Sequence, residues 1–288
     1  MKNIFDKTSS TWVRYSKYTF RKASDGTLYI APAKNADPII CEPFKDAEKM
    51  VLDAVNTGLL CMDSERKDEA KSAIMDFVST YGLLGLMTAM PTTPKFMEYE
   101  YVYLPKNDLI RDETMQTEEY IKLFYPFDTL EFVKHGVESI WDVANDKTMM
   151  ALAMTFSERP TAVNMSFQRQ YAERYDWLFA QFKTLAFIAL TPLFFYEDGV
   201  PDEAKKLYQM SIAAYAENAP TYHIALLDKP TIVWHFESLL LCIKMMLSFM
   251  IADDDNPLTV CSHCRMAFIA GKPGQKYCSE KCRREAQR

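Results

Sequence analysis

Four of the seven cysteines in this 288-residue chain lie within its last 28 residues. Cys261 and Cys264 are separated by two residues, and Cys278 and Cys282 by three. Two spaced pairs supply four thiolates, which is the donor set of a tetrahedral structural zinc site with Zn–S distances of about 2.3 Å. The sequence therefore predicts one bound zinc ion. Because protein ligands fill all four positions, we expect a structural rather than a catalytic metal.

The residues between the two cysteine pairs predict the local fold of this segment. Residues 268–270 have strand character, 271–274 form a glycine-containing turn, and 275–277 return the chain. The last two cysteines are four residues apart, so one helical turn places both sulfurs on the same face. A tight turn at Cys261 to Cys264, called the knuckle below, is followed by this hairpin and this helix. Together they predict a treble-clef-like finger. Buried free thiols, a redox-active dithiol, and replacement of one cysteine by His263 are the alternatives.

The charge of the chain is unevenly distributed. The formal net charge is −6, but residues 261–288 hold seven Lys or Arg against two Glu, so they carry +5 and the first 260 residues carry −11. A basic tail on an acidic body predicts a local anionic partner, or docking on the body itself. The candidate nucleic-acid contacts are Lys272, Lys276, Lys281, Arg283, Arg284 and Arg288.

The order of residues in this tail also carries a family resemblance. A cysteine pair is followed by the aromatic Phe268, a basic turn, Tyr277-Cys278-Ser279, and a last cysteine with two arginines after it. This order resembles the C-terminal zinc finger of bacterial CGNR-type proteins, and it is similar to the short Tyr-Cys-Ser zinc ribbons that end many bacterial and phage proteins. The resemblance covers about a tenth of the chain. It implies a helical body joined to a finger that binds DNA and acts in transcription regulation.

The remaining chain is predicted to be mainly α-helical with a small β element. The 49% hydrophobic content of the full chain suffices for a large core. Asp25-Gly26 lies between two strand-like runs, which predicts a β-hairpin. We expect a mainly helical domain with this N-terminal hairpin at 1–252, a linker at 253–260, and the zinc finger at 261–288.

Apolar residues at helical spacing predict helices at 46–58, around 70–81, at 165–190, from 201 to about 217, and at 230–252. Asp46 is the expected N-cap of the first helix, and Glu173 lies off the core-facing stripe of the third. The last helix is apolar on nearly every face, so we expect it at the centre of the core. Residues 97–103 alternate like a strand that pairs with the N-terminal hairpin, and 221–227 predict a short strand or an extended link.

No nucleotide-binding, hydrolase or metalloprotease motif occurs in the sequence, and only eight glycines are present. His135, His223 and His235 have no catalytic partner nearby in sequence, so we predict no catalytic residue. Alternating aromatic and basic residues at 12–22 fit a platform for single-stranded nucleic acid, but an ordinary β-hairpin is the favoured interpretation. An enzyme is therefore the least favoured class.

The N-terminus lacks the apolar run of a secretory signal, which predicts a cytoplasmic protein with reduced thiols. The apolar runs at 185–196 and 238–252 fall short of the roughly 18 to 20 residues that a membrane span requires, so we expect core helices and no membrane partner. Cys41, Cys61 and Cys242 are expected to be buried as small hydrophobes. Two functions remain: a zinc-finger regulator that binds DNA or RNA, and a structural protein whose finger docks on its own body, a protein partner or a second copy.

Overall fold

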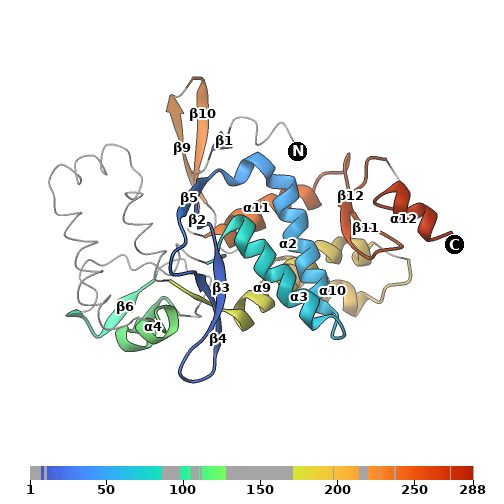
Figure 1. The fold of residues 1–288 in the computed structure, drawn as a ribbon. Helices are drawn as coiled ribbons and strands as arrows, with labels where there is room; N and C mark the ends of the chain where they lie inside the picture. The colour runs from blue at the N-terminus through green and yellow to red at the C-terminus, as the bar shows by residue number, and fades with distance from the viewer. Residues whose placement is uncertain are drawn as a thin grey trace.

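The chain is described here by a computed structural model, which covers residues 8–9, 12–85, 98–104, 110, 112–127, 171–196, 198–213, 220–226, 228–236, 238–272 and 274–287 (Figure 1). Among the residues singled out from the sequence, His135 and Arg288 lie outside the described residues.

Helix α2 (Ala47–Met62) is the centre of the body. It packs against α3 (Lys67–Tyr81), α9 (Tyr175–Phe195) and α11 (Leu239–Ile251), which come from distant parts of the sequence (Figure 1). Its apolar stripe at helical spacing is fully buried, as the sequence predicts: Met50, Val51, Ala54 and Val55. The predicted cap Asp46 makes no capping hydrogen bond, because residues 43–46 form a 3₁₀ turn before the helix.

Gly58 lies within α2, which continues to Met62, beyond the end at residue 58 that the sequence predicts. A methyl group on this residue would collide with the backbone carbonyl of Phe182 and would come within 2.7 Å of Ala186 Cβ. Both contacts belong to α9, so the missing side chain is what allows the two helices to approach closely. Glycine therefore sets the spacing of the central helix pair.

The predicted N-terminal hairpin is present. Strands β3 (Tyr18–Lys22) and β4 (Leu28–Pro32) pair antiparallel, and Gly26 adopts a φ of 86° in the turn. A second pair, β2 (Trp12–Tyr15) and β5 (Pro38–Cys41), lies next to them. The aromatic side chains Trp12, Tyr15 and Tyr18 are buried in the core, which favours an ordinary hairpin over a nucleic-acid platform.

Two expectations about the secondary structure of the body are wrong. Strand β6 (Tyr101–Tyr103) pairs with β7 (Thr114–Gln116), just before α4 (Thr117–Phe124), and not with the N-terminal hairpin. The segment expected as one helix at 230–252 begins as β10 (Pro230–His235), which pairs with β9 (Thr221–Leu226) and with the short β1 (Thr8–Ser9).

The switch from strand to helix has a local cause. Thr231, Ile232 and Val233 are β-branched, a type that favours strands. Ser238 then caps α11 by accepting a hydrogen bond from the Leu241 N–H at 3.0 Å. Only the part after this cap is helical, and it is the buried core helix that the sequence predicts.

Helix α9 also differs from expectation. It begins at Tyr175, after the short strand β8 (Glu173–Arg174), and contains Pro192. Residues 165–170 of the expected helix lie outside the described residues. Its 21 residues make it long and apolar enough to cross a membrane by length and composition, and it includes most of the apolar run at 185–196. Its inner face, including Leu178, Phe182 and Leu185, is buried. Helix α10 (Asp202–Ala213) packs against α9.

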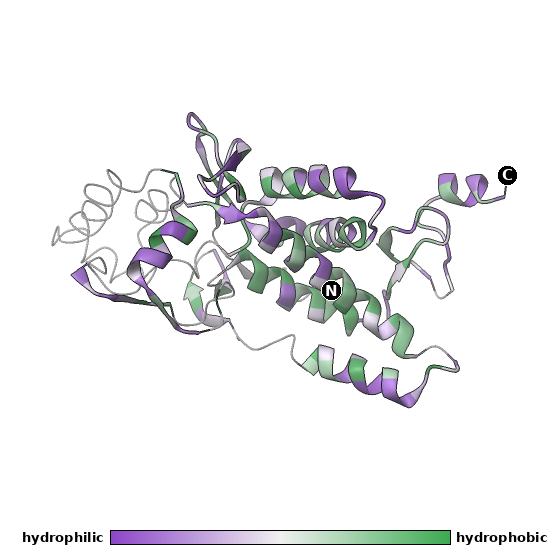
Figure 2. Cartoon of the chain, turned by 90° about the horizontal axis from the view of Figure 1, so that it is seen from below, coloured by the Kyte–Doolittle hydropathy of each residue, from purple (hydrophilic) through white to green (hydrophobic). Residues whose placement is uncertain are grey.

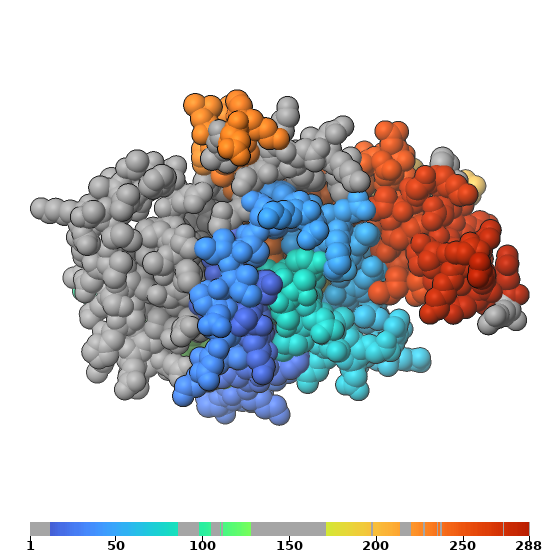
Figure 3. Space-filling model, turned by 45° about the horizontal axis from the view of Figure 1, so that its top comes forward, coloured from blue at the N-terminus to red at the C-terminus, as the bar shows by residue number. Residues whose placement is uncertain are grey.

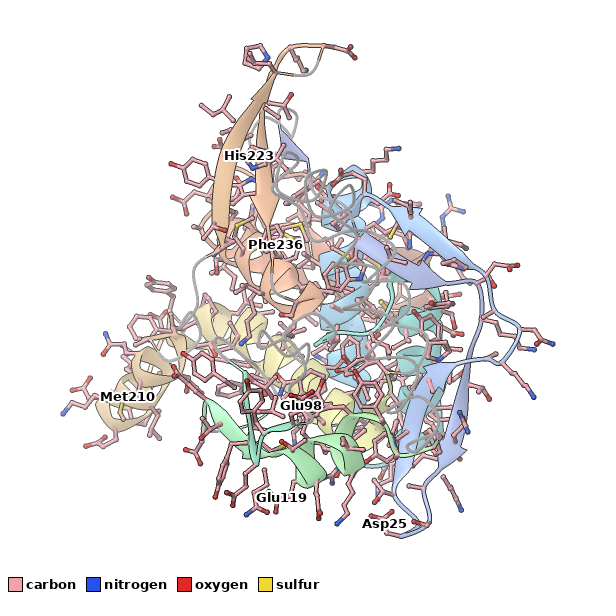
Figure 4. The ribbon with its side chains drawn as sticks, turned by 90° about the vertical axis from the view of Figure 1, so that its left-hand side faces the viewer. Asp25, Glu98, Glu119, Met210, His223 and Phe236 are labelled. Atoms are coloured by element: carbon pink, nitrogen blue, oxygen red, sulfur yellow. The ribbon has the colours of Figure 1, made fainter. Side chains whose placement is uncertain are left out.

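The described residues thus combine helices with five small sheets. The β9–β10 hairpin extends away from the body and holds His223 (Figure 4). The cysteine-rich segment lies at the opposite end of α2 from the first strands (Figure 1).

Replacing Gly58 with Ala tests the close approach of α2 and α9. Alanine raises intrinsic helix propensity by roughly 1 kcal/mol, but overpacking costs about 1–3 kcal/mol. We expect a net fall in the free energy of unfolding, measured by denaturant titration. Gly271→Ala is the control, because its added methyl would meet only Gln275 Oε1 at 3.8 Å. Equal stability of the two variants would contradict the packing argument.

Candidate metal centre

The finger is built on a hairpin that differs from the expected one. Strand β11 (Leu258–Val260) pairs antiparallel with β12 (Ala267–Ile269), so the two strands flank the first cysteine pair. The sequence predicted instead that the second strand would pair with 275–277. Residues 258–260, expected as the end of a linker, form the first strand of this hairpin.

Backbone and side-chain hydrogen bonds bring the second cysteine pair to the first. The Ser262 N–H donates to the Lys276 carbonyl at 2.9 Å, which holds the returning segment against the knuckle. Ser279 caps α12 (Glu280–Glu285) by accepting from the Cys282 N–H at 3.2 Å. The cap fixes the start of the helix, and thereby the direction of Cys278 and Cys282.

The four predicted cysteines converge. All four sulfurs lie within 4.8 Å of one another. Cys278 Sγ lies 3.7 Å from Cys264 Sγ and 3.5 Å from Cys282 Sγ. A tetrahedral site with Zn–S bonds of about 2.3 Å has S···S edges of about 3.8 Å, whereas a disulfide requires about 2.05 Å. The cluster can therefore hold one metal ion, and its geometry disfavours a disulfide.

The electrostatics of the cluster also suit a cation. Burial raises the pKa of Cys261, but the backbone N–H groups of Cys278, Cys264 and His263 outweigh it and lower this pKa to about 6. Burial and the neighbouring thiols raise the pKa of Cys278 to about 12. Metal binding requires thiolates, and the charge of the bound ion favours their ionisation.

His263 is not a member of the converging group. Its Nε2 lies 3.3 Å from Glu285 Oε2 on α12, so it links the knuckle to the helix. Arg265, which directly follows the first cysteine pair, has a φ of 63°, and this value lies in the left-handed region. Such a conformation costs a non-glycine residue about 1–2 kcal/mol, which the surrounding site must offset.

The hairpin also attaches the finger to the body. Asn56 on α2 donates to the Ala267 carbonyl at 3.2 Å and accepts from the Ala267 N–H at 2.6 Å. Its amide thus pairs with the backbone of β12 as a neighbouring strand would. Leu258 and Ala267 belong to the main hydrophobic core, whereas Phe268 packs with the cysteines. Figure 3 shows the finger lying directly beside the segment that contains α2.

The predicted nucleic-acid contacts lie on the exposed side of the finger. Lys272 and Lys276 are exposed in the turn and the returning segment. On α12, the side chains of Lys281, Arg283 and Arg284 are 81%, 57% and 75% exposed. Helix α12 lies at the outer end of the finger, away from α2 and α9 (Figures 1 and 2).

The other three cysteines and His223 belong to the body of the protein. Cys61 and Cys242 are buried, and burial raises the pKa of both thiols. Cys41 is half-buried and donates its S–H to the Trp12 carbonyl at 3.4 Å. His223 lies on β9, on the projecting hairpin. None of these groups joins the four-cysteine cluster.

Comparison of the chain with protein-family models, with curated proteins and with solved structures finds no match. The resemblance of the finger to CGNR-type proteins and its treble-clef-like fold therefore stay predictions. The candidate metal centre rests on the four cysteines themselves.

Loss of one ligand should abolish metal binding. We expect about one zinc per chain in the purified protein and a strong loss of zinc in Cys282→Ser, because three thiolates bind less tightly than four. Elemental analysis after extensive dialysis measures this ratio. Cys41→Ser, outside the cluster, is the control and should retain its zinc. Wild-type protein without bound metal would contradict the site.

Asn56 should stabilise the docked finger. Asn56→Ala removes both hydrogen bonds to Ala267 and should lower the free energy of unfolding by about 1–3 kcal/mol. Zinc content should stay unchanged because all four ligands are intact. Glu48→Ala, at an exposed position of the same helix, is the control. Unchanged stability and unchanged proteolysis of the finger in Asn56→Ala would show that the docking contact is unimportant.

Proposed function

We propose that this is a zinc-finger protein that binds nucleic acid through its C-terminal finger and acts as a regulator in the cytoplasm. The observation that carries the proposal is the division of the finger into two sides. Its hairpin is docked on the body through Asn56 of α2, which pairs with β12, and through Leu258 of β11, which belongs to the main core. Its basic helix α12 is exposed at the outer end, where a large anionic partner can reach it.

The metal would be zinc and its role structural. Four protein thiolates fill a tetrahedral site, so no position is open for water or substrate. Zinc would then contribute its binding free energy to folding of the finger. With the four thiolates and one dication counted, the net charge of the finger falls by two from +5 to about +3. The finger remains basic when loaded.

The arginines of α12 would be free to contact phosphate at low cost. Glu280 accepts from Arg283 at 2.7 Å and from Arg284 at 3.3 Å, and Lys281 lies 4.0 Å from Glu285. Such exposed ion pairs contribute at most about 1 kcal/mol each. Phosphate contacts position a protein on nucleic acid without reading its sequence, so these residues support affinity rather than a specific target.

A second candidate function rests on the docking contact itself. Asn56 and Leu258 join the finger to the main core, so the finger could act as a stabilising cap of the body or as part of a surface for a protein partner. In this case the basic residues would only keep the surface soluble. The two candidates differ in their dependence on salt, because phosphate contacts release counterions and hydrophobic docking does not.

The Arg283→Ala/Arg284→Ala variant tests nucleic-acid binding. We expect the wild-type protein to bind random duplex or single-stranded DNA with an affinity that falls steeply as salt rises. The double variant should bind at least about tenfold more weakly and should lose about two units from the logarithmic salt slope, roughly one per lost contact. Fluorescence polarisation at several salt concentrations measures both quantities.

Lys205→Ala/Lys206→Ala is the matched control, because it removes the same charge from α10 on the body. It should leave the affinity and the salt slope nearly unchanged. Equal loss in both variants would indicate a nonspecific effect of net charge. No binding by zinc-loaded wild-type protein at low salt would favour the structural function.

A further inference from the structure

A second candidate site lies in the body, far from the cysteines in sequence. A cavity of about 440 Å³ opens where the start of α9 meets α4. Pockets of about 300–1,000 Å³ are typical of small-molecule sites in proteins. This volume is therefore sufficient for a ligand of modest size.

The walls of the cavity are mainly apolar and aromatic. Phe124 comes from α4, Tyr171 precedes β8, and Trp177 lies in the first turn of α9. The rings of Phe124 and Tyr171 stack with centroids 5.9 Å apart. Aromatic faces carry negative electrostatic potential, so they favour a positively charged group near them.

A buried carboxylate borders this cavity. Glu173, expected on the exposed face of a helix, is only 2% exposed and lines the pocket from β8. Its Oε1 accepts from the Tyr171 O–H at 2.8 Å and from the Gly85 N–H, and its Oε2 accepts from the Leu84 N–H at 2.9 Å. These contacts orient the carboxylate, and Oε2 keeps a second lone pair for another donor.

The three hydrogen-bond donors to Glu173 are neutral, and among the residues that the structure describes Glu173 makes no ion pair. The adjacent Arg174 is engaged elsewhere, since its Nε donates to Asp176 Oδ1 at 2.9 Å. Burial raises the pKa of Glu173 to about 7, although the three hydrogen bonds act to lower it. A buried carboxylate in such a place is stabilised by a positive partner.

We propose that this cavity binds a small organic cation, a primary ammonium compound with an apolar body. The ammonium group donates to Glu173, and the apolar body packs against Phe124 and Trp177. The paired Arg174 and Asp176 contribute no net charge at the rim. This site is independent of the finger and of its proposed function.

The charge preference can be tested on the wild-type protein with two matched probes. 2-Phenylethylamine and 2-phenylethanol have nearly the same shape, but only the amine is charged at pH 8, where Glu173 is mostly ionised. We expect calorimetry to show at least about tenfold tighter binding of the amine, which corresponds to about 1.4 kcal/mol. Equal affinity for both probes, or no binding of the amine, would overturn the proposal.

Variants locate the interaction. Glu173→Gln should abolish the preference for the amine, whereas Glu119→Gln, at an exposed acidic position on nearby α4, should keep it (Figure 4). Because Glu173 also holds Leu84 and Gly85, its variant must first be shown to be folded by circular dichroism. Trp177→Ala provides a second test that keeps the carboxylate, and it should weaken binding of both probes. Unchanged amine binding in Trp177→Ala would place the ligand elsewhere and contradict the site.

Discussion

Helix α2 has to satisfy two neighbours at once, and the arrangement of the whole molecule depends on this requirement. On one side it approaches α9 so closely that residue 58 has no room for a side chain. Two residues earlier, Asn56 presents its amide to the backbone of β12. Residues two apart on a helix point in different directions, so the two contacts use different faces. The finger and the helical core are therefore positioned by the same short stretch of one helix.

The hairpin of the finger joins the main hydrophobic core to the cluster around the cysteines, because successive side chains of a β-strand point to opposite faces. Ala267 and Ile269 pack with the main core, whereas Phe268 and Ala270 pack with the cysteines. A shift of the strand by one residue would exchange these two sets. A metal ion bound on one face would thus support the position of the other face. Because of this sharing, metal loss should affect the body as well as the finger.

The sequence predicted best the features that depend on residues close together in the chain. The convergence of the four cysteines, the Asp25-Gly26 hairpin and the buried stripe of α2 follow from spacing and turn chemistry. Features that depend on distant partners were missed. Asn56 is an ordinary polar residue on an amphipathic helix until β12 is placed beside it. Glu173 was expected on an exposed helical face, but residues 171–174 are extended and the carboxylate turns inward to Leu84 and Gly85.

The dependence on distant partners also explains why the predicted strand pairing in the finger was wrong. Turn residues at 271–274 suggested that the chain folds back there, but β12 pairs with the strand before the first cysteine. Three residue pairs between β11 and β12 enclose the knuckle, and the docking of Ala267 on Asn56 adds a further partner to β12. The sequence offers no local signal for a contact across 211 positions.

The distribution of charge gains a physical meaning from this docking. The body carries −11 and the finger +5, yet the contacts that join them are a neutral amide and apolar side chains. The basic residues of α12 are therefore not used to hold the finger on the acidic body. A polyanion approaching the protein would be repelled by the body and attracted by the finger, and at 0.1 M salt both effects fade within about 10 Å. Binding through α12 would thus be local and oriented, with the acidic body facing away from the phosphates.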